Sequence, residues 1–161
     1  MAIKEGDSLP LDVKLKEMGE KGPQEVSVGD IFKGKTVVLF SVPGAFTPTC
    51  SMKHLPGFVE KAAEIRAKGV DDIVCIAVND AFVMGAWGDS QKAHGKVRMV
   101  ADGNGDLSKA LGLTMDASGF GMGTRGQRFA LIAKDGKVAH LLVEPGPGLT
   151  VSSADSVLGK L

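Results

Sequence analysis

Cys50 is the residue whose surroundings most clearly suggest chemistry. It follows the apolar run 36–42, which predicts a buried strand, and the strand-breaking pair Pro43-Gly44. Thr47 then suits a helix N-cap and Pro48 the first helical position, so Cys50 falls in the first helical turn. The free N–H groups and the positive end of the helix dipole favour a thiolate there. The spacing therefore predicts an activated nucleophile, although a cysteine is often only a small buried apolar residue.

The place of Cys50 within this turn adds a more specific expectation. In a capping box the third helical residue is a Glu that accepts a hydrogen bond from the N–H of the N-cap. Here a sulfur takes that place, so a thiolate at Cys50 could accept the bond from Thr47.

The elements that must position this turn follow an alternating pattern. After an irregular lead-in with short extended pieces, strands are expected at 36–42, 73–78, 97–101, 128–133 and 137–143. Helices are expected from Thr47 with an interruption or a kink at Pro56-Gly57, over 58–68, from 79–80 to about 93, over 106–111 and from 152. The last two strands form a hairpin across Lys134-Asp135-Gly136. The pattern predicts an α/β protein with a mixed sheet flanked by helices, in one domain over 1–161.

Composition narrows the classes of partner and compartment. Lys plus Arg and Asp plus Glu both number 19, so no excess of charge indicates nucleic acid or an anionic membrane. No apolar stretch approaches the ~20 residues of a membrane span. The polar N-terminus and only two cysteines predict a cytoplasmic, reducing environment. The alternative is an organelle such as a chloroplast or mitochondrion, reached with a transit peptide that has been removed.

Two glycine-rich motifs match nucleotide-binding patterns in the wrong context. Residues 29–36 fit the phosphate-loop pattern, and residues 121–126 fit the dinucleotide fingerprint. Both precede a predicted strand, whereas the phosphate-binding forms open a helix. We therefore predict no cofactor. The second motif is better explained as a flexible loop that delivers Arg125 and Arg128.

His54, one helical turn after Cys50, leaves other chemistries open. A metal site is disfavoured because the remaining histidines and cysteine show no ligand spacing. A cysteine-dependent hydrolase would need His54 as base and a third group to orient it, which nothing specifies. A dithiol reductase would need Cys-x-x-Cys, but position 47 is Thr. We expect His54 to be a polar residue packed beside the site.

The motif Pro43-x-x-x-Thr47-x-x-Cys50 resembles the active-site signature of the peroxiredoxins. The longer string 42–51 is similar to the type II, peroxiredoxin-5-like subfamily, and most of all to its plant-like members. Further matching segments extend the resemblance over nearly the whole chain: 54–58, 78–83, 86–87, 125–129 and 149–154.

This resemblance implies a thioredoxin-like fold and a thiol-dependent peroxidase. The enzyme would reduce hydrogen peroxide and alkyl hydroperoxides through a Cys50 thiolate and a sulfenic acid. Thr47 would hold the peroxide, Pro43 would shield the site, and the arginine of the family matches Arg128. By its residues alone, Arg128 is better explained as a solvated charge at a strand end. Arg125 is the second candidate for the same role.

Cys75 is the candidate resolving cysteine, although its strand predicts slow resolution at most. Residues 73–78 are apolar on both faces, so the thiol is expected to be buried. Some type II members carry a resolving cysteine where this chain has Val151. The plant-like members imply regeneration by glutaredoxin with glutathione, or by thioredoxin.

The resemblance also predicts a homodimer, which apolar residues placed in loops support: Phe46, Phe82, Val83 and Phe120. Two other classes of protein stay open at this stage. One is a redox-inert or chaperone-like binding protein with a thioredoxin fold, and the other a cysteine-dependent hydrolase or glyoxalase-like enzyme. Peroxide consumption with an added thiol would separate the three.

Overall fold

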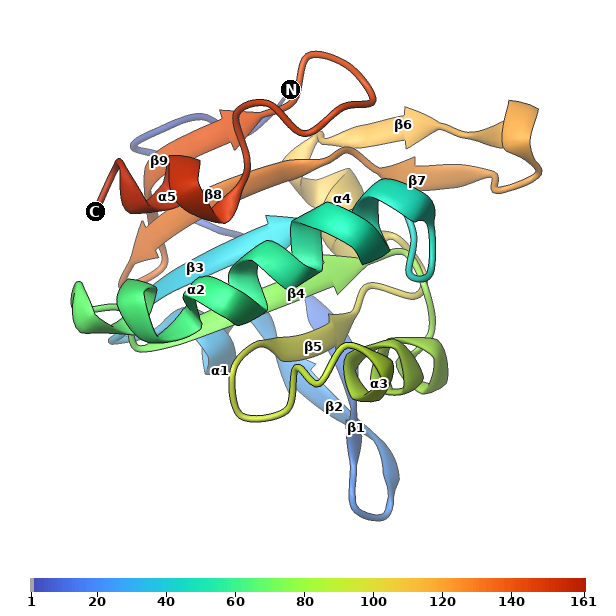
Figure 1. Cartoon of the computed structure of the whole chain (residues 1–161), viewed down its shortest axis with the longest axis horizontal. Coiled ribbons are helices and arrows are strands. Elements are labelled where there is room, and N and C mark those ends of the chain that lie inside the picture. The colour runs from blue at the N-terminus through green and yellow to red at the C-terminus, as the bar shows by residue number, and fades with distance from the viewer. Residues whose placement is uncertain (1) are drawn as a thin grey trace.

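The computed structural model describes residues 2–161, and within them a seven-stranded sheet forms the centre of the molecule (Figure 1). The strand order is β2-β1-β5-β4-β3-β8-β9. Three central strands are parallel: β3 (Thr36–Ser41), β4 (Asp72–Ala77) and β5 (Arg98–Ala101). Four others join antiparallel: β1 (Lys14–Gly19), β2 (Gly22–Ser27), β8 (Phe129–Lys134) and β9 (Lys137–Val143). The expected mixed sheet is confirmed.

Helices cover both faces of this sheet. One face carries α2 (Leu55–Ala67), α3 (Ala81–Ser90) and α5 (Ala154–Leu158), and Figure 1 shows α2 crossing over β3 and β4. The opposite face carries α1 (Val28–Phe32) and α4 (Asp106–Leu111). None of the helices within residues 2–161 is long and apolar enough to cross a bilayer.

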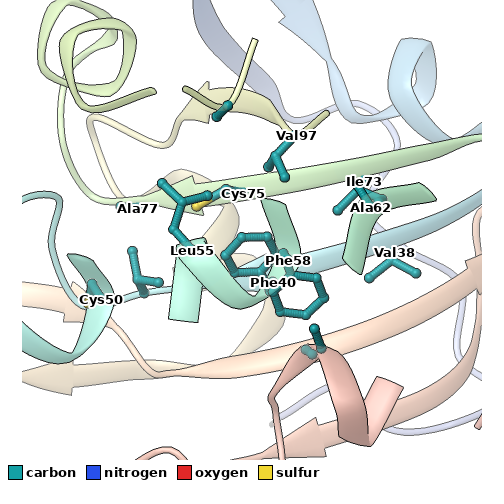
Figure 2. Close-up of a cluster of buried hydrophobic side chains, with 14 of the residues drawn as sticks. Val38, Phe40, Cys50, Leu55, Phe58, Ala62, Ile73, Cys75, Ala77 and Val97 are labelled. Atoms are coloured by element: carbon teal, nitrogen blue, oxygen red, sulfur yellow. The ribbon is translucent and has the colours of Figure 1, made fainter. Parts of the chain in front are cut away.

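The alternation of side chains along each buried strand divides the core into two layers. In β3, Val38 and Phe40 point toward α2, whereas Val37 and Leu39 point toward α1 and α4. The rings of Phe40 and Phe58 stack at 4.0 Å in the α2 layer. Figure 2 shows this layer, in which Cys50 and Cys75 are both members. Both cysteines therefore lie on the same side of the sheet.

The helix that begins at Pro48 differs from the sequence expectation. We predicted an interruption or a kink at Pro56-Gly57. The chain is not interrupted but stays helical to Ala67, and the irregularity lies one turn earlier, as the π-helical turn Cys50–His54. In that turn the N–H of Leu55 donates to the carbonyl of Cys50, five residues back. Proline lacks an N–H, and its ring crowds the carbonyl four residues before it, so widening the preceding turn relieves the conflict.

Two further differences concern segments expected to be irregular. The lead-in contains a complete hairpin, β1 with β2, instead of isolated extended pieces. The segment expected to be a flexible loop pairs β7 (Thr124–Gly126) with β6 (Thr114–Asp116) in a small second sheet. The predicted Asp-Gly hairpin turn is confirmed, because Asp135 and Gly136 both have positive φ, 49° and 75°.

Candidate active site

Cys50 lies in the first turn of the helix after β3, where the sequence placed it. The carbonyl of Thr47 accepts the first helical hydrogen bond from the N–H of Ser51, at 2.9 Å, as an N-cap does. The predicted capping bond is wrong, because the N–H of Thr47 points to the carbonyl of Gly44 at 3.4 Å. The Thr47 hydroxyl donates to that same carbonyl at 2.6 Å, which leaves its oxygen free to accept.

Arg128 is the cation that the structure brings to the sulfur. Its Nη2 donates to Cys50 Sγ at 3.1 Å, and both side chains are buried. Arg128 immediately precedes β8, and alternation places it on the sheet face of Ala130 and Ile132, as expected. A charge-assisted bond of this kind stabilises a sulfur anion.

His54 joins Arg128 to the C-terminal part of the chain. Its Nε2 lies 2.8 Å from the carbonyl of Ser152, and its Nδ1 lies 2.8 Å from Arg128 Nη1. Because a carbonyl only accepts, Nε2 carries the proton and Nδ1 accepts from the guanidinium. Burial, with a further contribution from Arg128, lowers the pKa of His54 to about 4. The ring is therefore neutral at pH 7. Its two nitrogens bind Ser152 and Arg128 and not the sulfur, which argues against the hypothesis that His54 is the base of a cysteine-dependent hydrolase.

Arg125, the second candidate, serves the wall of the site instead of the sulfur. Its Nε donates to the carbonyl of Met122 at 2.8 Å, and its Nη1 donates to the carbonyl of Pro43 at 3.2 Å. Arg125 thus fixes the strand-to-helix loop against the β6–β7 sheet. The choice between the two arginines rests on this geometry.

A cleft of about 700 Å³ opens at the start of the helix that carries Cys50, although the Cys50 side chain itself is fully buried behind the lining. Its lining includes Pro43, Thr47 and Arg128, together with the apolar side chains of Met115 and Phe120. The Nε of Arg128 is buried and has no hydrogen-bond partner within residues 2–161. A buried donor without a partner is unfavourable, so this atom is suited to meet a polar ligand that enters the cleft.

Cys75 is buried, as its strand predicted. It lies opposite Phe40 in the β3–β4 ladder and has no exposed surface. Burial raises the pKa of its thiol well above the ordinary value, the neighbouring Cys50 adds to this, and Arg128 acts in the opposite direction. Both cysteines are free thiols in this structure.

Glu144, which sequence reasoning missed, is a second buried charge near the site. Its carboxylate accepts hydrogen bonds from the N–H groups of Thr150, Val151 and Ser152 and from two of their hydroxyls. Desolvation acts to raise the pKa of Glu144, but these donors outweigh it and lower the pKa to about 2. No sequence rule connects a glutamate at a strand end to a turn six residues later.

Metal ligands do not gather anywhere in the described part of the chain. Among residues 2–161, no three His, Cys, Asp or Glu side chains stand together as an ion would require. The groups around Cys50 are instead hydrogen-bond donors and one cation, which suit an anion or a peroxide.

Comparison with known proteins identifies the family. The Redoxin family model matches residues 4–158. Peroxiredoxin-2B of Arabidopsis thaliana is 54% identical over 138 residues, which cover 86% of this chain and 85% of that protein. Peroxiredoxin-2C of Oryza sativa subsp. japonica is 50% identical over 157 residues, covering 97% and 96%. Reduced Prx3 of Vibrio vulnificus, solved in complex with hydrogen peroxide, has a TM-score of 0.93 at 47% identity and 98% coverage of both chains.

The sheet, its helical layers and the cysteine at the end of β3 define a thiol-based redox enzyme with a thioredoxin-like fold. The chain belongs to the peroxiredoxin family, within its type II subfamily. It is accordingly a thiol-dependent peroxidase, which settles the choice between the three classes that the sequence left open.

Proposed function

We propose that Cys50 is the residue that reacts with peroxide, assisted by Thr47, Arg128 and Pro43. The observation that carries this proposal is the 3.1 Å hydrogen bond from Arg128 Nη2 to Cys50 Sγ. It gives one of the two free thiols a fixed cation. Both cysteines are fully buried, but Cys50 directly follows residues that line the cleft, whereas Cys75 lies within strand β4. The bound hydrogen peroxide of the Vibrio vulnificus relative supports a peroxide substrate.

The reaction is a two-electron displacement at oxygen. The Cys50 thiolate attacks one peroxide oxygen in line with the O–O bond, so that an S–O bond forms as the O–O bond breaks. The sulfur is oxidised to a sulfenic acid, and the departing oxygen takes a proton and leaves as water or an alcohol. Hydrogen peroxide and alkyl hydroperoxides undergo the same step.

Each neighbouring group has a physical role in this step. The oxygen of Thr47, whose hydroxyl donates to Gly44, accepts the O–H of the peroxide and orients it. The guanidinium of Arg128, including its unpartnered Nε, stabilises charge on the departing oxygen. Pro43 forms the apolar wall that limits access of water.

An external thiol completes the cycle. The thiol condenses with the sulfenic acid to form a mixed disulfide and water, and a second thiol then releases Cys50. We assign these thiols to glutathione with glutaredoxin, or to thioredoxin. Cys75 resolves slowly at most, because its raised pKa and complete burial both hinder disulfide exchange.

The test is peroxide consumption by the purified protein with glutathione and glutaredoxin, and separately with thioredoxin. Cys50→Ser should abolish turnover in both systems while preserving the circular-dichroism spectrum, since the change is nearly isosteric. Cys75→Ser is the matched control, because it alters the other thiol of the same core layer. Unchanged turnover in Cys50→Ser would end the proposal.

We further propose a homodimer in the cytoplasm, with an organelle as the alternative compartment. Three phenylalanines on the surface support self-association: Phe46 is 55% exposed, Phe82 is 64% exposed and Phe120 is 82% exposed. The placement of Phe82 and Val83 in a loop was wrong, because both lie in the first turn of α3. Chloroplastic relatives from rice and Arabidopsis thaliana make the organelle a reasonable alternative. A monomeric mass by light scattering at micromolar concentration would contradict the dimer.

A further inference from the structure

A buried carboxylate holds the loop that follows β9. Glu144 is only 7% exposed. Its two oxygens accept from the N–H groups of Thr150, Val151 and Ser152 and from the hydroxyls of Thr150 and Ser152, over 2.6–3.0 Å. Only an ionised carboxylate can accept all of these bonds, because an amide or a protonated acid turns one position into a donor.

The loop depends on this carboxylate for its course. Residues 145–148, Pro-Gly-Pro-Gly, are exposed and therefore contribute little packing of their own. Three backbone N–H groups that converge on one side chain instead fix where Ser152 lies. Loss of the negative charge would leave several of these donors unpaired, and Ser152 is completely buried.

Ser152 in turn holds the groups that contact the sulfur. Its carbonyl accepts from His54 Nε2 at 2.8 Å, the Nδ1 of His54 accepts from Arg128 at 2.8 Å, and Arg128 donates to Cys50 at 3.1 Å. All four residues are buried. A displacement of Ser152 therefore reaches the guanidinium through two short hydrogen bonds in a packed interior.

Glu144 is also the acidic residue that lines the same cleft as Arg128. Arg128 belongs to none of the ion pairs found within residues 2–161. Glu144 and Arg128 line the same cleft, and the N–H of Glu144 donates to the carbonyl of Arg128 at 3.0 Å. A buried cation without a nearby negative charge is unfavourable, so the carboxylate favours this placement of the guanidinium.

We infer that Glu144 is a positioning residue for the peroxide reaction: through Ser152 and His54 it sets Arg128 against Cys50. The inference rests on the proposed roles of Cys50 and Arg128. Glu144 takes no part in bond making, and its effect is mainly to place the guanidinium through the hydrogen bonds of Ser152 and His54. A misplacement of about 1 Å in such a site lowers the rate by up to ~10²-fold.

The experiment measures single-turnover oxidation of reduced Cys50 by hydrogen peroxide, with the sulfenic acid trapped and quantified by mass spectrometry. Glu144→Gln is compared with Asp102→Asn, a matched control. Asp102 is a carboxylate 2% exposed that accepts from Leu107 and Ser108 at the start of α4. Glu144→Gln should slow the reaction about 10–100-fold, whereas Asp102→Asn should leave it within about twofold, although both lose a buried charge.

A double-mutant cycle separates positioning from general loosening of the fold. If Glu144 acts through Arg128, then Glu144→Gln added to Arg128→Ala should cause little further loss. An equal loss in both backgrounds, or an equal loss in Asp102→Asn, would overturn the inference. So would a normal rate in Glu144→Gln when Arg128→Ala is slow, and this result would leave the proposed function intact. A wild-type protein that does not consume peroxide would instead refute the proposed function itself.

A milder variant covers the case in which Glu144→Gln does not fold. Thr150→Val is nearly isosteric at an exposed residue and removes only the 2.6 Å bond from the Thr150 hydroxyl to Glu144. It should slow the same reaction by a smaller factor, again only when Arg128 is present. An unchanged rate in this folded variant would contradict the inference.

Discussion

Acid should destabilise this protein through His54, and the loss should begin at about pH 6, before ordinary carboxylates start to titrate. The pKa of His54 is lowered from 6.5 to about 4, first by burial and further by Arg128. Between these values the unfolded chain binds a proton that the folded protein excludes. The stabilisation is therefore complete above about pH 6.5 and is lost progressively as the pH falls toward 4.

The size of the effect follows from the difference between the two pKa values. One pKa unit corresponds to 1.36 kcal/mol, so the full difference gives a ceiling of about 3 kcal/mol. Between pH 7 and pH 4.5 the expected loss in the free energy of unfolding is about 2.5 kcal/mol. His54→Gln should remove this pH dependence, because glutamine supplies one donor for Ser152 and one acceptor for Arg128 without titrating.

The assay is urea unfolding from pH 7 to pH 4.5, followed by the fluorescence of Trp87 and by circular dichroism. Trp87 is the single tryptophan, and its indole donates to the hydroxyl of Ser51, the residue after Cys50. Protein concentration must be constant, because association changes apparent stability. His94→Gln alters an exposed histidine and should keep the slope of the wild type. The reasoning is refuted if His54→Gln loses as much stability as the wild type over this range.

In stopped-flow measurements, Arg128→Ala should slow peroxide reduction about 10²–10³-fold, because Arg128 contacts the sulfur. Arg125→Ala should slow it much less, because Arg125 contacts only the site wall. The reverse order would show that the roles of the two arginines are misassigned. The Cys75→Ala variant should keep the turnover of the wild type with glutathione and glutaredoxin. If the variant were inactive and the oxidised wild type contained a Cys50–Cys75 disulfide, regeneration of Cys50 by an external thiol would be contradicted. The Gly126→Ala variant should have a free energy of unfolding lower by about 1–3 kcal/mol. The reason is that the added Cβ would lie 2.9 Å from Ser108 Oγ, which is too close. An unchanged melting temperature would count against this packing argument.

The sequence was sufficient for the features that depend on local pattern. Apolar runs and turn residues located the central strands, and Thr47-Pro48 located the helix start that carries Cys50. The continuous apolar run over 73–78 also predicted that Cys75 is buried. Patterns of this kind succeed because strand periodicity, capping and turn chemistry act over a few neighbouring residues.

Only the tertiary structure decided how distant residues meet at the sulfur. Arg125 and Arg128 could not be separated by local rules, because strand pairing determines which side chain reaches Cys50 and which reaches Pro43. The π turn before Pro56 likewise resolves a conflict within a helix that packing keeps intact.

The connection from Glu144 to Cys50 shows the same limit most clearly. It passes through hydrogen bonds between residues up to 98 positions apart, as in the pair His54 and Ser152. A hydrogen bond depends on distances of a few tenths of an ångström. A linear pattern carries no information at that scale until the sheet and its helices bring the side chains together.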